Sequence, residues 1–206
     1  ATGSNILLAP MVNIKRSPLN GRNYEVFSED PYLSGIMANS FISGVQSENI
    51  ISVIKAMIAN NQQTDQHNLD VQLSERPLRE IYMPSFKIPR NHESPWGLMT
   101  SYNRLNGFQT SENSHILQAI LKGEWNYKGF VVSDWRAVES MEALYAGVDV
   151  EMPGPGKFMT RENVIKEVKK GKLTEEKLDE KVKRILRALV KAKVLDYDDP
   201  QLNGEL

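Results

Sequence analysis

The 206-residue chain has no cysteine, which excludes disulfide bonds, thiol catalysis and thiolate metal sites. No apolar run approaches the ~20 residues of a membrane span, so we expect a soluble protein without a transmembrane segment. The formal net charge is −1, and we therefore expect neither nucleic acid nor a membrane as a partner. The first residues, ATGSN, show no signal peptide, and the composition leaves the compartment open.

Two kinds of binding motif are also missing. The glycine-rich phosphate motifs GxGxxG and GxxxxGK[ST] do not occur, which argues against a nucleotide site. The chain has three histidines, His67, His92 and His115, and none has the spacing of metal ligands. We therefore expect no metal and no cofactor. His67 follows residues of a polar loop that leads toward the candidate site described below. It is therefore either a surface residue or a side chain that reaches into that site.

The chain does contain a regular alternation of apolar strands and helical segments. Short runs rich in β-branched and aromatic residues predict strands, and most lead into a stretch with the apolar spacing of a helix. The predicted strands are residues 5–10, 51–57, 97–103, 129–134 and 147–153. The predicted helices are residues 32–46, a segment from 74 past 82, 111–121, 136–147, 161–170 and a segment from 174 to 190.

A parallel series of strand–helix units forms either an open doubly wound sheet or a barrel. The absence of a phosphate motif and the polar residues at most strand ends favour the barrel. A complete (β/α)₈ barrel has eight strands in ~250 residues, so about three units are missing. We predict an α/β fold, a partial TIM (β/α)₈-type barrel of about five units with parallel strands. It forms a single domain over residues 1–206, with the β/α units in 1–156 and terminal helices and a tail in 157–206.

The sequence GFVVSDW, residues 129–135, is the most informative stretch. Its continuous apolar run is typical of a strand that is buried on both faces. Asp134 follows at the carboxyl end of this strand, where β/α folds bind ligands, and Trp135 lies beside it. A carboxylate next to a flat apolar ring suits carbohydrate chemistry. The alternative is that Asp134 only caps the following helix.

Several further motifs extend this interpretation to nearly the whole chain. They are LLAPMVNIKRSPLNGRNYEVFSEDPYL, IANNQQTD, SERPLREIYMPSF, MTSYNRLNG, GEWNYKGFVVSDW and AGVDVEMPGPG, in this order. Together they closely resemble glycoside hydrolase family 3, on its β-glucosidase side. The resemblance implies a retaining exo-glycosidase whose (β/α)₈ barrel is followed by an α/β sandwich domain.

The resemblance also implies the roles of five residues. It identifies Asp134 as the nucleophile and Trp135 as a wall of the sugar subsite. Tyr102 is expected to approach the nucleophile, and Arg22 and Lys55 are expected to hold sugar hydroxyls. The residue types fit the reaction, because nearby cations keep a carboxylate ionised. The expected substrate is a β-glucoside or an oligosaccharide.

Departures from the family pattern are equally informative. Ala56 and Gln66 replace a sugar-binding histidine and arginine of the family, and the early motif that supplies a further aspartate is absent. The sandwich domain, which supplies the acid/base glutamate, is absent too. Glu151, Glu25 and Asp149 are the nearby carboxylates that we nominate as substitutes. Each also has a structural interpretation, in loop hydrogen bonding or strand-end capping.

Three interpretations therefore stay open. The chain is part of a β-glycosidase barrel, a catalytically impaired carbohydrate-binding or structural relative, or a fragment with exposed strand edges. An open five-stranded sheet leaves two unpaired edges and an uncovered apolar face. We therefore expect the chain to form a homo-oligomer, to bind a complementary chain that completes the barrel, or to cover its edges with its own terminal helix.

Overall fold

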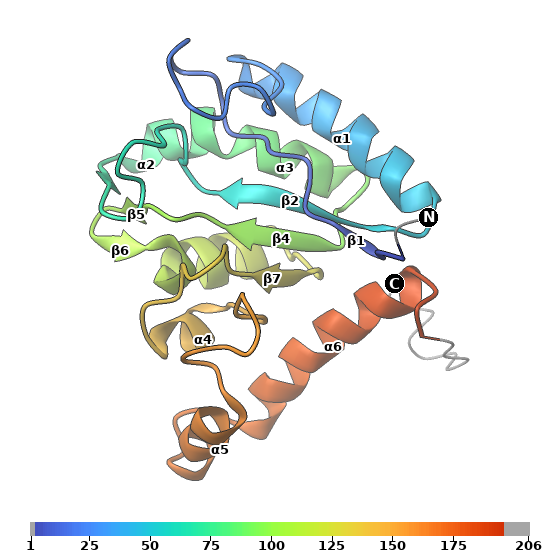
Figure 1. Ribbon diagram of the computed structural model, residues 1–206, viewed down its shortest axis with the longest axis vertical. Coiled ribbons are helices and arrows are strands. Elements are labelled where there is room, and N and C mark those ends of the chain that lie inside the picture. Colours follow the sequence, from blue (N-terminus) through green and yellow to red (C-terminus); the bar gives the residue numbers. More distant parts are fainter. Residues whose placement is uncertain (1–2, 196–206) are drawn as a thin grey trace.

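A four-stranded parallel sheet forms the centre of the computed structural model, which describes residues 3–195 (Figure 1). Its strands follow the order β1-β2-β4-β7, and all three neighbouring pairs are parallel. This confirms the predicted α/β fold with parallel strands. The strands are β1 (Ile6–Leu7), β2 (Ile51–Met57), β4 (Gly97–Thr100) and β7 (Phe130–Val132).

The fifth predicted strand, residues 147–153, is wrong. Val150 forms only an isolated bridge with Val132. The amides of Asp149 and Val150 both donate to the carbonyl of Val131, at 2.7 and 3.0 Å. Two consecutive N–H groups on one acceptor interrupt the alternation that a ladder requires, so the segment adds no regular strand.

Helices cover one face of the sheet, where Ile54, Leu98 and Val131 contribute to the larger hydrophobic core (Figure 1). At Gly35 a Cβ atom would lie 2.7 Å from Ile88 Cδ1, so two of these helices approach closely only because residue 35 is glycine. The helices on this side include α1 (Pro31–Ser47), the π-helical η1 (Leu78–Tyr82), α3 (Pro84–Asn91) and the π-helical η3 (His115–Glu124).

The helix α6 (Glu175–Lys191) covers the other face of the sheet, after the shorter α5 (Arg161–Lys169). Ala188 and Ala192 pack with a smaller cluster of strand residues there. The apolar side chains of this helix are only partly buried, since Val182 and Leu186 are 45% and 40% exposed while Lys181 is buried. The strand residues of this cluster are Ile51, Val53, Met99, Phe130 and Val132. The terminal helix thus covers part of the face that the open sheet exposes.

Two predicted helices differ from the expectation, since one is divided and the other is shorter. The segment from residue 74 divides into α2 (Glu75–Pro77), η1 and α3, since Pro77, Pro84 and Pro89 have no N–H for a continuous ladder. The predicted helix over 136–147 is reduced to α4 (Glu142–Ala146).

Side chains from a neighbouring segment explain the shortening before α4. Gln109 and Ser111 donate to the carbonyl of Ala137, and Glu112 accepts the amides of Glu139 and Ser140. These bonds occupy backbone groups that a helix would need. Because α4 starts at Glu142, the alternative that Asp134 is its N-cap is wrong.

A second, three-stranded sheet lies outside the predicted pattern. It joins β3 (Asp70–Val71), β5 (Arg104–Leu105) and β6 (Phe108–Gln109), and an Asn106–Gly107 turn connects the last two strands. Because β4 ends at Thr100, the third predicted strand is three residues too long. Among the described helices none is long and apolar enough to cross a membrane.

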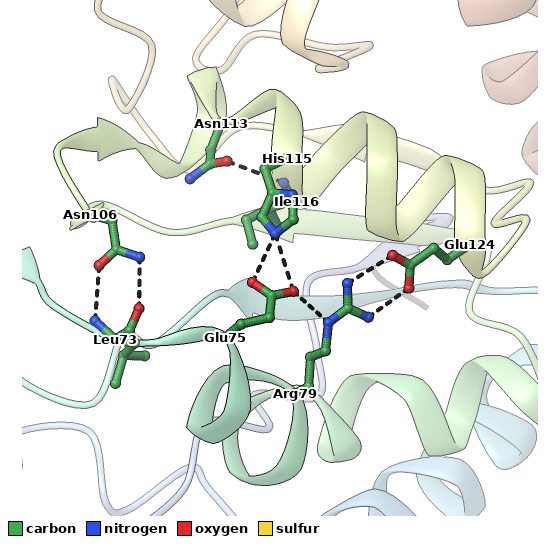
Figure 2. Close-up of polar contacts among 8 residues, drawn as sticks. All are labelled: Leu73, Glu75, Arg79, Asn106, Asn113, His115, Ile116 and Glu124. Atoms are coloured by element: carbon green, nitrogen blue, oxygen red, sulfur yellow. Dashed lines mark hydrogen bonds and ion pairs between the residues drawn. The ribbon is translucent and has the colours of Figure 1, made fainter.

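Figure 2 shows how an exposed polar network links this region to η3. Glu75 contacts His115 Nε2 at 3.1 Å and pairs with Arg79, which also donates to both oxygens of Glu124 at 2.6 and 2.8 Å. Asn106 exchanges hydrogen bonds with the backbone of Leu73. The network crosses from α2 and η1 to η3 at the protein surface.

Candidate active site

A cavity of about 400 Å³ lies at the carboxyl ends of β2, β4 and β7. Parallel strands of an α/β fold bind their ligands at this end. The five residues predicted for the site all line the cavity and are therefore brought together. The lining residues are Leu8, Arg22, Tyr24, Lys55, Gln63, Gln66, Met99, Tyr102, Asp134 and Trp135.

Asp134 lies two residues beyond β7 and is the only carboxylate among the lining residues. Its Oδ1 accepts the amide of Trp135 at 2.8 Å, which fixes the carboxylate against the strand end. The Trp135 side chain is 39% exposed, so its ring is available to a ligand. Burial, together with the hydrogen bond and the negative charge of Asp134, raises the pKa of Tyr102 to about 12. Tyr102 is therefore a neutral hydrogen-bond donor at physiological pH.

Arg22 and Lys55 are held by Glu25, which lies beside the cavity without lining it. Arg22 Nε donates to Glu25 Oε1 at 2.7 Å, and Lys55 Nζ lies 3.4 Å from Glu25 Oε2. Burial alone would raise the pKa of Glu25, but the hydrogen bond from Arg22 and the charges of Lys55 and Arg22 hold it below its ordinary value. An ionised Glu25 positions two cations and is a poor proton donor.

The other two nominated carboxylates are engaged away from the cavity. Glu151 accepts the backbone amides of Lys157, Phe158 and Met159, so it closes the loop that follows the 147–153 segment. Asp149 is buried and accepts the Val131 amide at 2.8 Å. Both carboxylates therefore have structural partners in place of solvent or ligand.

The family-model comparison decides the family. The model "Glycosyl hydrolase family 3 N terminal domain" matches residues 1–188. This chain belongs to glycoside hydrolase family 3. Among curated relatives, thermostable beta-glucosidase B of Acetivibrio thermocellus is 47% identical over 93% of this chain. Beta-glucosidase B of Emericella nidulans is 41% identical over 98% of it.

Solved structures give the same result. Beta-glucosidase 3B from Thermotoga neapolitana, in complex with glucose, superposes on 97% of this family-3 chain with a TM-score of 0.85 and 45% identity. Beta-glucosidase from Kluyveromyces marxianus, also in complex with glucose, superposes on 98% with a TM-score of 0.88 and 33% identity. The chain covers 30% and 24% of these two structures, and about a quarter of the two curated relatives.

The cavity has further lining residues to which the family motifs assign no role. Tyr24 is 83% exposed in the long loop before α1, and Gln63 lies in the polar loop after β2. Gln66 lines the cavity, whereas Ala56 is fully buried, with its amide and carbonyl both bonded to Asn13. In the sequence, the length and polarity of their loops are therefore the features that point to Tyr24 and Gln63.

His67 lies at the edge of the family-3 site. Its ring centroid is 4.5 Å from that of Tyr102, with the two rings tilted by 59°. His67 is an exposed residue and does not line the cavity, so it contacts the site through Tyr102. Within residues 3–195, no group of three or more histidine, aspartate or glutamate side chains has an arrangement that holds a metal ion.

Proposed function

We propose that this chain is the catalytic barrel portion of a retaining β-glycosidase that acts on terminal β-D-glycosyl residues, with Asp134 as the nucleophile. The observation that supports this most directly is a single carboxylate in a cavity shared with two cations and an exposed tryptophan. The two beta-glucosidase structures described above, both in complex with glucose, support a glucose-type sugar.

Each lining residue has a part in the proposed reaction. Trp135 stacks on the apolar face of the sugar, and Arg22 and Lys55 donate hydrogen bonds to its hydroxyls. Asp134 attacks the anomeric carbon, the glycosidic C–O bond breaks, and the leaving oxygen takes a proton from a general acid. Water then hydrolyses the glycosyl ester, and the base that activates it recovers the proton. Tyr102 donates to the carboxylate and orients it.

The proposed general acid lies outside the described residues of this chain. Retaining glycosidases place their two carboxyl groups about 5–5.5 Å apart. In residues 3–195, Asp134 is the one carboxylate that lines the cavity, and Glu25 and Glu151 are engaged by cations or backbone amides. We therefore propose that residues 1–206 form a single, incomplete barrel domain that is completed by further sequence, a second copy or a complementary chain.

The decisive experiment compares hydrolysis of an aryl β-glucoside by the wild-type chain and by Asp134→Ala. An activated aryl leaving group needs little protonation, so the test does not depend on the missing acid. We expect the variant to lose about 10⁴-fold or more in rate. Added azide should restore cleavage in the variant and yield the α-glycosyl azide, because azide replaces the carboxylate on the same face.

The control is Glu29→Gln, which removes an exposed carboxylate from the loop that carries Arg22. It should keep wild-type turnover. Hydrolysis that persists in Asp134→Ala would contradict the assignment of the nucleophile.

A second candidate function is carbohydrate binding without catalysis. Gln66, in place of a charged family residue, and the single carboxylate in the cavity favour it. It predicts that the wild-type chain binds glucose, measured by calorimetry, while the aryl glucoside stays intact.

A further inference from the structure

A second cavity, of about 530 Å³, lies between η3 and the first half of α6, away from the candidate active site. Five of its lining residues are cationic. Lys177, Lys181 and Arg184 lie on one face of α6, at the i, i+4 and i+7 spacing of a helix. Lys122 comes from η3 and Lys172 from the turn before α6. We call this cavity the basic groove.

At the base of the basic groove, two lysines share one carboxylate. Lys122 Nζ lies 3.1 Å from Asp149 Oδ1, and Lys181 Nζ lies 3.6 Å from the same oxygen. Both lysine side chains are at most 10% exposed, and Asp149 is fully buried. Arg184 adds a third positive charge and donates to the backbone carbonyl of Tyr127 at 2.6 Å. One buried carboxylate therefore pairs with two ammonium groups, and Arg184 adds to the positive charge around them.

The carboxylates at the rim do not restore the balance. Glu180 pairs with Lys183 on the outer side of α6 at 3.3 Å. Hydrogen bonds from its own backbone amide and from Thr174 lower the pKa of Glu176, so this carboxylate is engaged at the start of the helix. Five cations face the two lining carboxylates, the buried Asp149 and Glu167, which accepts a hydrogen bond from the lining Tyr145 and lies near Lys172, so the basic groove keeps one excess positive charge.

The state of Lys181 agrees with this excess. Burial, together with the charges of Lys122 and Arg184, lowers its pKa to about 8 against the attraction of Asp149. An additional anion in the groove would reduce the repulsion among these groups. The charged hydrogen-bond donors of η3 and α6, on the two sides of the groove, also match the acceptor oxygens of an oxyanion.

We propose that the basic groove binds a small polyvalent oxyanion, as inorganic phosphate or a phosphate monoester. A neutral sugar would leave the charge excess unchanged, which favours a charged ligand over a second carbohydrate site. The groove is built from η3, the turn at Lys172 and α6, so the bound anion stabilises the packing of α6 on the rest of the fold. This inference does not depend on the proposed glycosidase activity.

The test is a titration of the full chain with inorganic phosphate near neutral pH. Sodium chloride keeps the ionic strength constant, because screening alone changes weak surface electrostatics. We expect saturable binding by calorimetry and a rise of the thermal midpoint with phosphate concentration, as a ligand that binds only the folded state produces.

Two variants remove cations of the groove, and one control removes a cation elsewhere. Lys181→Met removes a buried cation, and Lys177→Gln removes one at the exposed rim, where the fold does not depend on it. Each should weaken phosphate affinity about tenfold or more. Lys169→Gln, in α5 and outside the groove, should bind phosphate as the wild type does.

Phosphate that acts no more strongly than chloride at equal ionic strength would overturn the proposal. Equal weakening in Lys177→Gln and Lys169→Gln would also overturn it, since the effect would then reflect net charge alone. A phenyl phosphate titration separates the two sources of the anion: tighter binding than inorganic phosphate indicates a monoester, and weaker binding indicates free phosphate.

Discussion

Two aspartates beside the same strand, β7, show different uses of one chemical group. Asp149 is fully buried, accepts the amide of Val131 and faces the ammonium groups of Lys122 and Lys181. Asp134, beyond the end of the strand, lines a cavity and accepts the amide of Trp135. The two cations that line the same cavity, by contrast, are bound by a different carboxylate.

That different carboxylate is Glu25, which pairs with both Arg22 and Lys55. The cations near Asp134 are thus fixed in place without being neutralised by Asp134 itself. The comparison teaches that the number of charged groups in a cluster does not distinguish a structural carboxylate from the one proposed as the nucleophile. What distinguishes them is whether the cations are already paired with another group.

The largest expected effect contrasts the two aspartates directly. Asp149→Asn leaves two buried ammonium groups without their counter-charge and should cost about 3–5 kcal/mol of unfolding free energy. Asp134→Asn should change stability by less than about 1 kcal/mol, because its carboxylate has no buried ion pair. Urea denaturation of both variants measures the difference. Equal losses would contradict the contrast.

The pH dependence of stability tests the cationic side of the Asp149 cluster. The pKa of Lys181 is lowered to about 8, so between pH 8 and its ordinary value of 10.5 the folded state binds fewer protons than the unfolded state. The free energy of unfolding should therefore rise with pH in this window, by at most about 3 kcal/mol.

The contribution of Lys181 to this pH dependence is isolated by comparing the wild type with a variant that lacks the lysine. Lys181→Met should lose the part of the rise that Lys181 contributes, whereas Lys122, whose pKa burial also lowers, keeps its own part. Urea denaturation of both proteins between about pH 7.5 and pH 9.5 avoids the tyrosine titrations above this range. A variant whose stability follows the wild type at every pH would show that Lys181 is not the responsible group.

Glu25→Gln tests whether fixed cations serve the site of Asp134. The loss of a charge-assisted hydrogen bond of roughly 1.5–3 kcal/mol should lower kcat/KM for an aryl glucoside about 10- to 100-fold, mainly through KM. Glu25→Asp should restore part of it, because the shorter carboxylate still attracts both cations. A loss of kcat with an unchanged KM would instead support Glu25 as a proton donor.

The smallest expected effect comes from the surface network of Figure 2. Arg79 bridges Glu75 and Glu124 in an exposed position. Arg79→Met should change the free energy of unfolding by at most about 1 kcal/mol, and the change should shrink in high salt. Thermal unfolding at two salt concentrations measures it. A loss as large as that of Asp149→Asn would remove the distinction between buried and exposed clusters.

The sequence was sufficient to predict most of the sheet and the place of Asp134. A continuous apolar run marks β7 because both of its faces are buried, against helices on one side and α6 on the other. The motifs of the family resemblance then predicted Arg22, Lys55 and Tyr102, which line the same cavity. The partial barrel and the family are confirmed, while the catalytic roles stay predictions.

Other features could not be predicted, since they depend on contacts distant in sequence. The helix expected over 136–147 is lost to side chains around Gln109 and Glu112, which no local periodicity reveals. Lys181 is buried by its contacts with Asp149 and Val148, more than 30 residues earlier, so the apolar pattern of α6 does not reveal that this lysine is buried. The ion pair of Glu25 with Lys55 likewise joins a loop to a strand that is distant in sequence, so a local pattern does not predict it.

The position of α6 also determines the order in which the fold is completed during synthesis. The strand face that α6 covers is made of residues 51–132, whereas the helix itself spans Glu175–Lys191. A ribosome that adds ~5–20 residues per second leaves this face uncovered for several seconds after its last strand has emerged. Ala188 and Ala192, near the end of the helix, are the last residues to shield it. Chaperone demand for this protein should therefore peak late, just before the helix emerges.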